Sequence, residues 1–334
     1  MTIKIAINGF GRIGRNVTRA LVEGGHDDFE LVAINDLAPL ETNAHLLKFD
    51  TVHGRFERDV KTTANTIDIG DGPIRVTSKR NPADLLWNDV DIVFECTGLF
   101  KSRETATAHL ENGSSRVLIS APGNDVDKTI VYGVNHELLG PDDHIVSNAS
   151  CTTNCLAPVV KILNDNIGID RGFMTTVHAY TGSQPMLDTY HKDLYRARAG
   201  AANMIPTSTG AAKAVGLVLP ELEGRLGGVA IRVPLPNVSV VDLTFDASRL
   251  TSAEEINALM HAAADSAPLK GILGCTDRKL VSSDFNHDAR SSIFVTDQTN
   301  VMDGKMARIL TWYDNEWGYS NRMIDTAREM AKYL

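Results

Sequence analysis

The sequence contains little cysteine: four residues, Cys96, Cys151, Cys155 and Cys275, in a chain of 334. Small secreted proteins that depend on disulfide bonds are much richer in cysteine. The N-terminal stretch "MTIKIAINGF" also lacks the basic region and long apolar segment of a secretion signal. We therefore expect reduced thiols and a cytoplasmic location.

Long apolar runs and an excess of positive charge are absent as well. No run approaches the roughly 18 apolar residues of a membrane span. Lys and Arg number 33 against 42 Asp and Glu, so the net charge is −9, which repels polyanions. These features argue against nucleic-acid and membrane partners, and no Cys or His spacing predicts a metal site.

The first 150 residues alternate short β-rich runs with helical patterns. A helix from Arg12 has an apolar stripe and ends at Gly24-Gly25, and another helix begins after Ser102. This alternation predicts parallel βαβ units in a Rossmann-type domain over residues 1–150. The expected strands are 3–8, 29–35, 91–98, 116–122 and 145–150.

Longer extended runs follow residue 165, with Asp303-Gly304 as a hairpin turn. They predict a largely antiparallel α+β catalytic domain over residues 151–315, so the fold class is α/β with a second domain. The expected strands lie within 172–180, 227–245, 291–297 and 305–314.

Two helix starts are predicted in this second half. Ser252 and Glu255 match a capping box, and Ser320 is an expected N-cap of a C-terminal helix within about 316–334. This last helix has an apolar face and is expected to pack on the first domain, with these residues on that face: Met323, Ile324, Ala327 and Met330.

A glycine-rich turn follows the first expected strand and opens a helix. Gly9, Gly11 and Gly14 match GxGxxG, which allows a tight turn and presents helix N–H groups to a pyrophosphate. Asp36 ends the next strand, where a carboxylate accepts both ribose hydroxyls and repels a 2′-phosphate. The pattern predicts NAD rather than NADP.

Cys151 lies in a polar stretch, "SNASCTTNC". With Ser150 as N-cap, it falls in the first turn of a helix, where the dipole favours a thiolate. Pro158 is expected to kink this helix or delay its start. His178 is the nearest candidate base, but the residues alone leave a buried thiol and a hydrogen-bonded histidine as an alternative. Cys155 is interpreted as a small buried hydrophobe.

Long ordered motifs resemble phosphorylating glyceraldehyde-3-phosphate dehydrogenase over essentially the whole chain. They are "INGFGRIGR", "SNASCTTNCLAP", "HAYT", "TSTGAAKAV", "RVPLPNVSVVDL" and "WYDNEWGYSNR". The resemblance implies that Cys151 adds to the aldehyde of glyceraldehyde 3-phosphate and that His178 is the base. A hemithioacetal is oxidised to a thioester, and inorganic phosphate then releases 1,3-bisphosphoglycerate, a reaction of glycolysis and gluconeogenesis.

The resemblance also implies binding residues, and it implies a homotetramer in which the loop 182–203 lies near a neighbouring subunit's cofactor. For the contact to the substrate phosphate, Arg198 is an alternative to Arg196, which lies two residues away. Substrate or phosphate contacts are assigned to Ser150, Thr152, Thr181, Arg196, Thr209, Gly210 and Arg232. NAD contacts are assigned to Gly9, Gly11, Arg12, Ile13, Gly14, Asp36, Arg80, Thr97, Ser120 and Asn315.

Some residues depart from the family pattern. Leu235 replaces a frequent threonine, and "MLDTYH" (186–191) differs from the usual sequence near the cofactor, which bears on NAD preference. "DFNHD" (284–288) and "AHLLKFDTVHGRF" (44–56) resemble the sister enzyme erythrose-4-phosphate dehydrogenase, the main alternative. Intact "HAYT" and "STGAA" favour phosphorolysis. A thiol redox sensor or a nucleotide-linked interaction protein is the lower alternative.

Overall fold

The computed structural model describes residues 2–334, which form two compact units. The first unit extends to Ile130 and also includes His136–Ala149 and Ser320–Leu334. The second consists of Val131–Asn135 and Ser150–Tyr319. The C-terminal residues are therefore part of the first unit, where Arg328 Nε donates to Asp28 Oδ2 at 2.6 Å.

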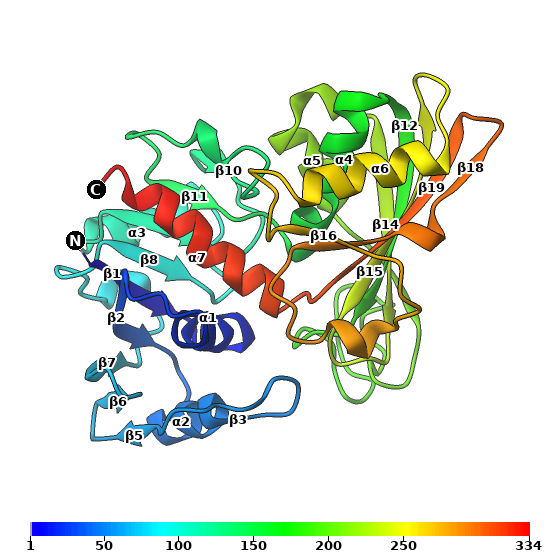
Figure 1. Cartoon of the computed structure of the whole chain (residues 1–334). Helices are drawn as coiled ribbons and strands as arrows, with labels where there is room; N and C mark the ends of the chain where they lie inside the picture. Colours follow the sequence, from blue (N-terminus) through cyan, green and yellow to red (C-terminus); the bar gives the residue numbers. More distant parts are fainter. Residues whose placement is uncertain (1) are drawn as a thin grey trace. The chain divides into compact units, whose positions relative to one another are not determined.

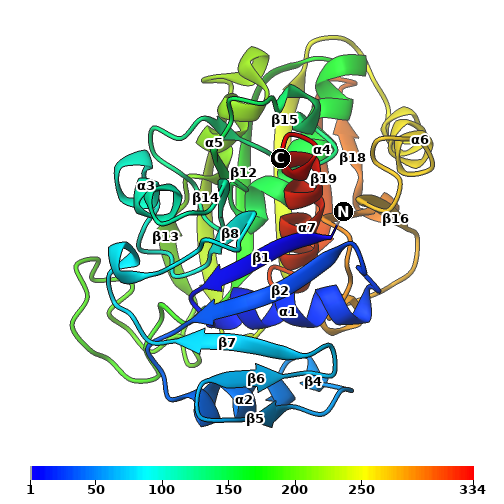
Figure 2. The same ribbon diagram turned by 90° about the vertical axis from the view of Figure 1, so that its left-hand side faces the viewer.

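The first unit is built on a parallel-dominated sheet, as the sequence predicts. Its strand order is β10-β11-β9-β8-β1-β2-β7-β6-β5, and Figure 2 shows β1, β2, β7 and β6 side by side. Every pair from β10 to β7 is parallel, and only the hairpin β5–β6 and its pairing with β7 are antiparallel. The strands are β1 (Ile3–Asn8), β2 (Phe29–Asn35), β5 (Lys61–Thr62), β6 (Thr66–Asp68), β7 (Pro73–Thr77), β8 (Ile92–Glu95), β9 (Arg116–Ile119), β10 (Lys128–Thr129) and β11 (Ile145–Ser147).

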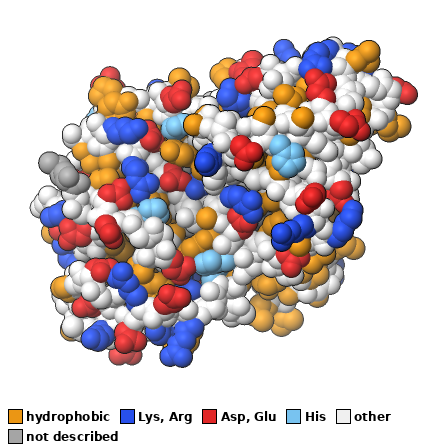
Figure 3. All heavy atoms as spheres, in the orientation of Figure 1, with side chains coloured by type: hydrophobic (Ala, Val, Ile, Leu, Met, Phe, Trp, Pro, Cys, Tyr) orange, Lys and Arg blue, Asp and Glu red, His pale blue; other side chains and the backbone are white. Residues whose placement is uncertain are grey.

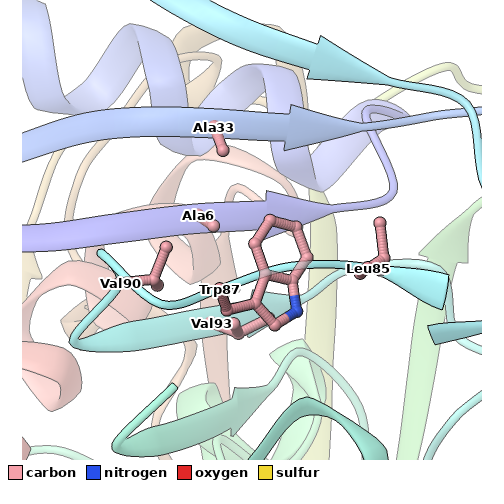
Figure 4. Packing of buried hydrophobic residues seen from close by; sticks show 6 residues of the cluster. All are labelled: Ala6, Ala33, Leu85, Trp87, Val90 and Val93. Atoms are coloured by element: carbon pink, nitrogen blue, oxygen red, sulfur yellow. The ribbon is translucent and has the colours of Figure 1, made fainter. Parts of the chain in front are cut away.

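Helices and a hydrophobic core support this sheet. Helix α1 (Arg12–Glu23) ends before Gly24, and α3 (Arg103–Glu111) has Ser102 as its N-cap, both as predicted. Residues of β1, β2 and β8 pack with the segment before β8 in one cluster, shown in Figure 4: Ala6, Ala33, Leu85, Trp87, Val90 and Val93. Helix α2 (Leu40–Lys48) and the small pair β3 (Phe49–Asp50) and β4 (Gly54–Arg55) were not predicted from the sequence.

The second unit contains a mostly antiparallel sheet with the order β13-β14-β12-β15-β19-β17-β16, and β18 pairs with β19. Its two parallel pairs are β12–β14 and β16–β17. The β18–β19 hairpin turns at Asp303 and Gly304, whose φ angles of 50° and 67° fit the predicted turn. The strands are β12 (Ile169–Ala179), β13 (Ile205–Ser208), β14 (Leu226–Val233), β15 (Ser239–Ala247), β16 (Leu273–Thr276), β17 (Ser292–Val295), β18 (Asn300–Met302) and β19 (Met306–Tyr313).

Figure 1 labels the helices α4, α5 and α6 of this unit. They are α4 (Cys151–Asn166), α5 (Ala211–Val218) and α6 (Ala253–Ala264). The short 3-10 helices of the chain are η1 (Pro82–Asp84), η2 (His136–Leu138), η3 (Pro220–Leu222), η4 (Ser282–Phe285) and η5 (Thr296–Gln298).

One predicted helix start needs correction. Helix α7 (Trp317–Ala331) begins before Ser320, because Asp314 Oδ1 accepts the N–H groups of Glu316 and Trp317 at 2.9 and 2.8 Å. Its predicted apolar face is buried at Met323, Ile324, Ala327 and Met330, as expected.

At α6 only half of the predicted capping box forms. Ser252 Oγ accepts from the N–H of Glu255 at 3.2 Å. The carboxylate of Glu255 instead accepts from Thr251 Oγ1 and from Arg249, because the guanidinium is a stronger partner than a backbone N–H.

On the face shown in Figure 3, acidic and basic side chains are interspersed. Within residues 2–334, no helix has both the length and the apolar character needed to cross a membrane.

Candidate active site

The glycine-rich turn of the first unit lies between β1 and α1. Gly9 has φ +96°, and a Cβ there would lie 2.6 Å from Thr97 N. A Cβ on Gly14 would lie 2.3 Å from Gly9 O, so packing within the protein itself requires both glycines. Gly11, the N-cap of α1, has nothing within 4 Å of its Cβ position. This open side leaves room for a ligand's phosphates to approach the helix N-terminus, so the turn fits a dinucleotide.

Asp36 is held beside this turn by two backbone donors. Its Oδ2 accepts from Phe10 N at 2.7 Å and its Oδ1 from Ala38 N at 2.8 Å. A carboxylate has about four acceptor positions, so two remain for ribose hydroxyls. The carboxylate therefore has the place and the capacity that the sequence predicted for NAD.

The other predicted cofactor residues of this unit follow the carboxyl ends of its strands. Arg12 and Ile13 open α1, Thr97 follows β8 and Ser120 follows β9. Arg80 follows β7 and is exposed. In parallel sheets this edge is where nucleotides bind.

Arg12 forms an ion pair with Asp50 that the sequence did not reveal. Burial alone would raise the pKa of Asp50. The hydrogen bond from Arg12 and the N–H groups of His53 and Val52 instead hold the pKa of this carboxyl well below its usual range. The guanidinium at the start of α1 is therefore oriented by the protein itself.

In the second unit, Cys151 is the first residue of α4. Ser150 Oγ accepts from Thr153 N at 3.0 Å, and Asn154 Nδ2 donates to Ser150 O at 3.0 Å. The helix contains Pro158 but starts where the cap predicts, so the expectation of a delayed start is wrong. Two local bonds around Ser150 suffice to begin the helix, and the thiol occupies its N-terminal turn.

Sγ of Cys151 lies 3.5 Å from Nε2 of His178. His178 is buried near the end of β12, and its Nδ1 lies 2.7 Å from the carbonyl oxygen of Ala179. The contact with this carbonyl oxygen fits a proton on Nδ1, which leaves Nε2 to accept the thiol proton, whereas Arg232 Nη1, which only donates, lies 2.5 Å from the same Nδ1 and fits the other tautomer. The tertiary structure thus brings the thiol and the imidazole, which are distant in sequence, into contact.

Arg232 lies beside this pair. Parallel pairing of β12 and β14 sets His178 opposite Arg232, whose Nη1 donates to Ala179 O at 2.8 Å and lies 2.5 Å from His178 Nδ1. Burial and the Arg232 charge lower the pKa of His178 to about 3. Burial raises the pKa of Cys151, and the Arg232 charge only partly opposes this effect. Without an anion, the pair is therefore a neutral thiol beside a neutral imidazole.

The structure distinguishes the two candidate arginines of the 182–203 loop. Arg196 Nε donates to Thr207 Oγ1 at 2.8 Å, and its charge acts on both His178 and Arg232. Arg198 Nε donates to Asp188 at 2.6 Å, and its side chain is 61% exposed. Arg196, rather than Arg198, adds positive charge near His178.

The remaining predicted residues lie on loops and helix ends of this unit. Thr181 follows β12, and its Oγ1 is 3.0 Å from Ser183 Oγ. Thr209 Oγ1 accepts from Ala211 N at 3.2 Å, and Gly210 is the N-cap of α5 with open space at its Cβ position. Asn315 Oδ1 accepts from Ser239 Oγ at 2.8 Å.

Comparison with known proteins agrees with this geometry. The model of the glyceraldehyde 3-phosphate dehydrogenase NAD binding domain matches residues 3–103, and that of the C-terminal domain matches residues 150–315. The chain is 67% identical to glyceraldehyde-3-phosphate dehydrogenase of Cereibacter sphaeroides over 100% of both chains. Identity is 66% to that of Xanthobacter flavus and 52% to that of Geobacillus stearothermophilus, over 99% of each chain.

The chain belongs to the glyceraldehyde-3-phosphate dehydrogenase family. The resemblance drawn from its motifs is confirmed, and it contains the NAD binding domain of that family.

Tyr313 lies in the candidate site but was not predicted from the sequence. The buried hydroxyl lies 2.8 Å from Thr152 Oγ1 and 2.9 Å from Thr176 Oγ1. Its ring meets His178 edge-on, with centroids 6.0 Å apart. The alternation along β19, in which every second residue to Tyr313 is buried, could have indicated an inward side chain.

Cys155, the second cysteine of the motif, is fully buried and has Ser292 Oγ 3.7 Å from its Sγ. Burial raises its pKa to about 12, so this thiol is unreactive. Burial raises the pKa of Cys96 to about 12 as well. Among residues 2–334, no three His, Cys, Asp or Glu side chains gather as metal ligands would.

Proposed function

We propose that this protein catalyses the NAD-dependent oxidation and phosphorylation of glyceraldehyde 3-phosphate to 1,3-bisphosphoglycerate. The observation that carries the mechanism is the 3.5 Å contact between Cys151 Sγ and His178 Nε2. The names of the full-length relatives support the substrate and the reaction. Intact "HAYT" and "STGAA" elements favour this reaction over that of erythrose-4-phosphate dehydrogenase.

The thiol and the imidazole act together. Sγ of Cys151 bonds to the aldehyde carbon while Nε2 of His178 takes the thiol proton and passes it to the aldehyde oxygen, which forms a hemithioacetal. His178 then accepts the hydroxyl proton as the carbon is oxidised to a thioester. NAD, when bound, supplies the acceptor for the hydride that this oxidation releases. A phosphate oxygen finally attacks the thioester and the C–S bond breaks.

Two phosphate groups require positive charge and hydrogen-bond donors. We assign Arg232, Arg196 and Thr181 to the phosphate of the substrate. Arg196 is preferred because its charge acts on His178, whereas Arg198 is engaged with Asp188. The residues assigned to the attacking phosphate or the substrate are Ser150, Thr152, Thr209 and Gly210.

An anion bound by Arg232 also changes the base. Burial and the guanidinium charge both lower the pKa of His178, so a phosphate that neutralises this charge reverses the second of these two effects and raises the pKa. Substrate binding therefore strengthens His178 as a proton acceptor at the moment when Cys151 must lose its proton.

The division of labour follows the two halves of the chain. Residues 1–150, together with the C-terminal helix, bind NAD and contain the NAD positions named above apart from Asn315. Asn315 is the NAD contact from residues 151–315, which perform the chemistry. Asp36 favours NAD over NADP, because its carboxylate accepts ribose hydroxyls and repels a 2′-phosphate.

The protein is further proposed to act in the cytoplasm as a homotetramer. Its 182–203 loop exposes large apolar side chains that a single chain leaves in water. A second copy of the chain that covers this loop removes the unfavourable exposure of these side chains to water. The residues are Met186, Leu187, Tyr190 and Leu194, each at least 79% exposed.

NADH absorbance tests the reaction. Glyceraldehyde 3-phosphate and erythrose 4-phosphate are compared, each with and without phosphate, using NAD and then NADP. We expect the highest rate with glyceraldehyde 3-phosphate, phosphate and NAD together. A rate that does not depend on phosphate would exclude the phosphorolysis step, and no NADH with either aldehyde would favour a sensor or binding role.

A further inference from the structure

A buried chain of polar side chains crosses the carboxyl ends of neighbouring strands in the first unit. Asn35 Nδ2, at the end of β2, donates to Asn8 Oδ1 of β1 at 2.8 Å. Asn8 Nδ2 donates to Glu95 Oε2 of β8 at 2.6 Å. From the other side, Trp87 Nε1 donates to His109 Nδ1 at 3.0 Å, and His109 Nε2 lies 3.1 Å from Glu95 Oε2. Both branches end on one carboxylate.

Glu95 is 1% exposed and receives two donors on each oxygen. Oε2 accepts from Asn8 and His109, and Oε1 accepts from the N–H of Thr97 at 2.8 Å and from Thr97 Oγ1. Four donors match the acceptor positions of an ionised carboxylate, and a buried carboxylate without them would be strongly unfavourable. The arrangement therefore orients Glu95 completely.

His109 has only one tautomer that satisfies its neighbours. The indole N–H of Trp87 only donates, so His109 Nδ1 is the acceptor and Nε2 carries the proton that goes to Glu95. The His109 and Glu95 side chains are both fully buried. Trp87 is itself fixed in the hydrophobic cluster of Figure 4, so the ring and its proton have one orientation.

The carboxylate controls a turn at the point where the strand order reverses. Thr97 Oγ1, which donates to Glu95, accepts from Leu99 N at 3.0 Å, and Gly98 between them has φ +70°. The N–H of Thr97 lies where a Cβ on Gly9 would collide with it. In the sheet, β1 has β2 as its neighbour on one side and β8 on the other, so the strand order reverses between β1 and β8. Ligands of such sheets bind outside the carboxyl ends of the strands at this switch point.

We propose that Trp87, His109 and Glu95 are positioning residues that set the affinity for the dinucleotide by holding the Thr97–Leu99 turn against Gly9. This inference rests on the NAD binding described under the proposed function. None of the three contacts the reacting atoms, so they act on cofactor binding and leave the chemical step at Cys151 alone.

The test uses the full-length enzyme and titration calorimetry with NAD. Glu95→Gln preserves volume but presents an amide N–H₂ to donors, so we expect NAD affinity to fall about tenfold or more. His109→Phe removes both ring contacts and is expected to have a similar effect. His109→Gln keeps one acceptor and one donor and is expected to restore part of the affinity.

Val90→Ala is the matched control, because it removes methyl groups from the same cluster without touching a polar contact. It is expected to lower the unfolding temperature while NAD affinity remains that of the wild type. Trp87→Phe keeps a ring in the cluster and removes only the donor to His109. In this variant, ¹⁵N shifts of the His109 ring should show loss of the single tautomer, and the KM for NAD should rise several-fold with kcat nearly unchanged.

Wild-type NAD affinity in Glu95→Gln and Trp87→Phe, or an equal loss in Val90→Ala, would overturn the positioning role while leaving the proposed reaction intact. A wild-type protein that binds NAD without forming NADH would instead refute the reaction and leave the positioning role standing. A kcat loss without a change in the KM for NAD would also contradict the inference.

Discussion

Cys151 and His178 are 27 residues apart in the sequence, yet Sγ and Nε2 are 3.5 Å apart. The first turn of α4 carries the thiol, and β12 carries the imidazole. Nδ1 of His178 lies 2.7 Å from Ala179 O and 2.5 Å from Arg232 Nη1, and Nε2 is the ring nitrogen that faces the thiol. One short contact thus singles out Cys151 Sγ and His178 Nε2 as the proposed nucleophile and base.

The two cysteines of the motif should respond differently to substitution. Cys151→Ser is expected to lower kcat by at least about 10³-fold, because a hydroxyl is a far weaker nucleophile at neutral pH. Cys155→Ala should keep most activity and lose about 1 kcal/mol of unfolding free energy, since the fully buried Cys155 only packs. Steady-state NADH formation and urea unfolding measure both effects. Equal activity losses would show that Cys155 is misassigned.

The depressed pKa of His178 makes stability depend on pH. Its pKa of about 3 in the folded protein is below the usual value of about 6.5. Between these values the unfolded chain binds a proton that the folded chain does not, so the unfolding free energy falls as the pH falls. The slope from this residue is at most about 1.4 kcal/mol per pH unit.

His178→Asn removes this contribution. Urea unfolding of the variant and the wild type at pH 7, 5.5 and 4.5 should therefore show a shallower decline for the variant. Parallel curves would mean that His178 titrates normally in the folded protein. The same variant should lower kcat about 10²- to 10⁴-fold at pH 7, the usual range for loss of a general base.

The two arginines of the loop provide a matched pair. Arg196→Ala should raise the KM for glyceraldehyde 3-phosphate about 10- to 100-fold, because a charge-assisted contact to phosphate is lost. Arg198→Ala should change this KM less than about threefold, since its partner is Asp188 on the surface. Initial-rate kinetics at saturating NAD and phosphate decide between them, and the reverse order would reassign the phosphate contact to Arg198.

Asp36 should control the choice of cofactor. Asp36→Ala removes the acceptor for ribose hydroxyls and the negative charge, so the kcat/KM for NAD is expected to fall about tenfold or more. Discrimination against NADP should shrink for the same reason. The ratio of the two kcat/KM values measures this change. An unchanged ratio would place cofactor selectivity in another element, with the 186–191 loop as the first candidate.

Local patterns were sufficient for much of the architecture. Periodicity and turn residues predicted β1, α1, β2 and the Asp303-Gly304 hairpin, because these depend on interactions between near neighbours in sequence. The start of α7 was misplaced at Ser320, since only the folded geometry shows that the Asp314 carboxylate bonds to the N–H groups of Glu316 and Trp317. The short strands β5 and β6 have too little periodicity to be recognised.

The sequence by itself determined the family and the glycine-rich turn, and it predicted the roles of Asp36 and Cys151, because these lie in continuous motifs whose spacing carries their chemistry. Only the tertiary structure decided that Arg196 rather than Arg198 adds charge near His178, that Tyr313 completes the surroundings of His178, and that Glu95 is oriented by Trp87 through His109. Each of these relationships joins residues on different elements. Distances between such elements are set by strand register and core packing, which no local pattern encodes.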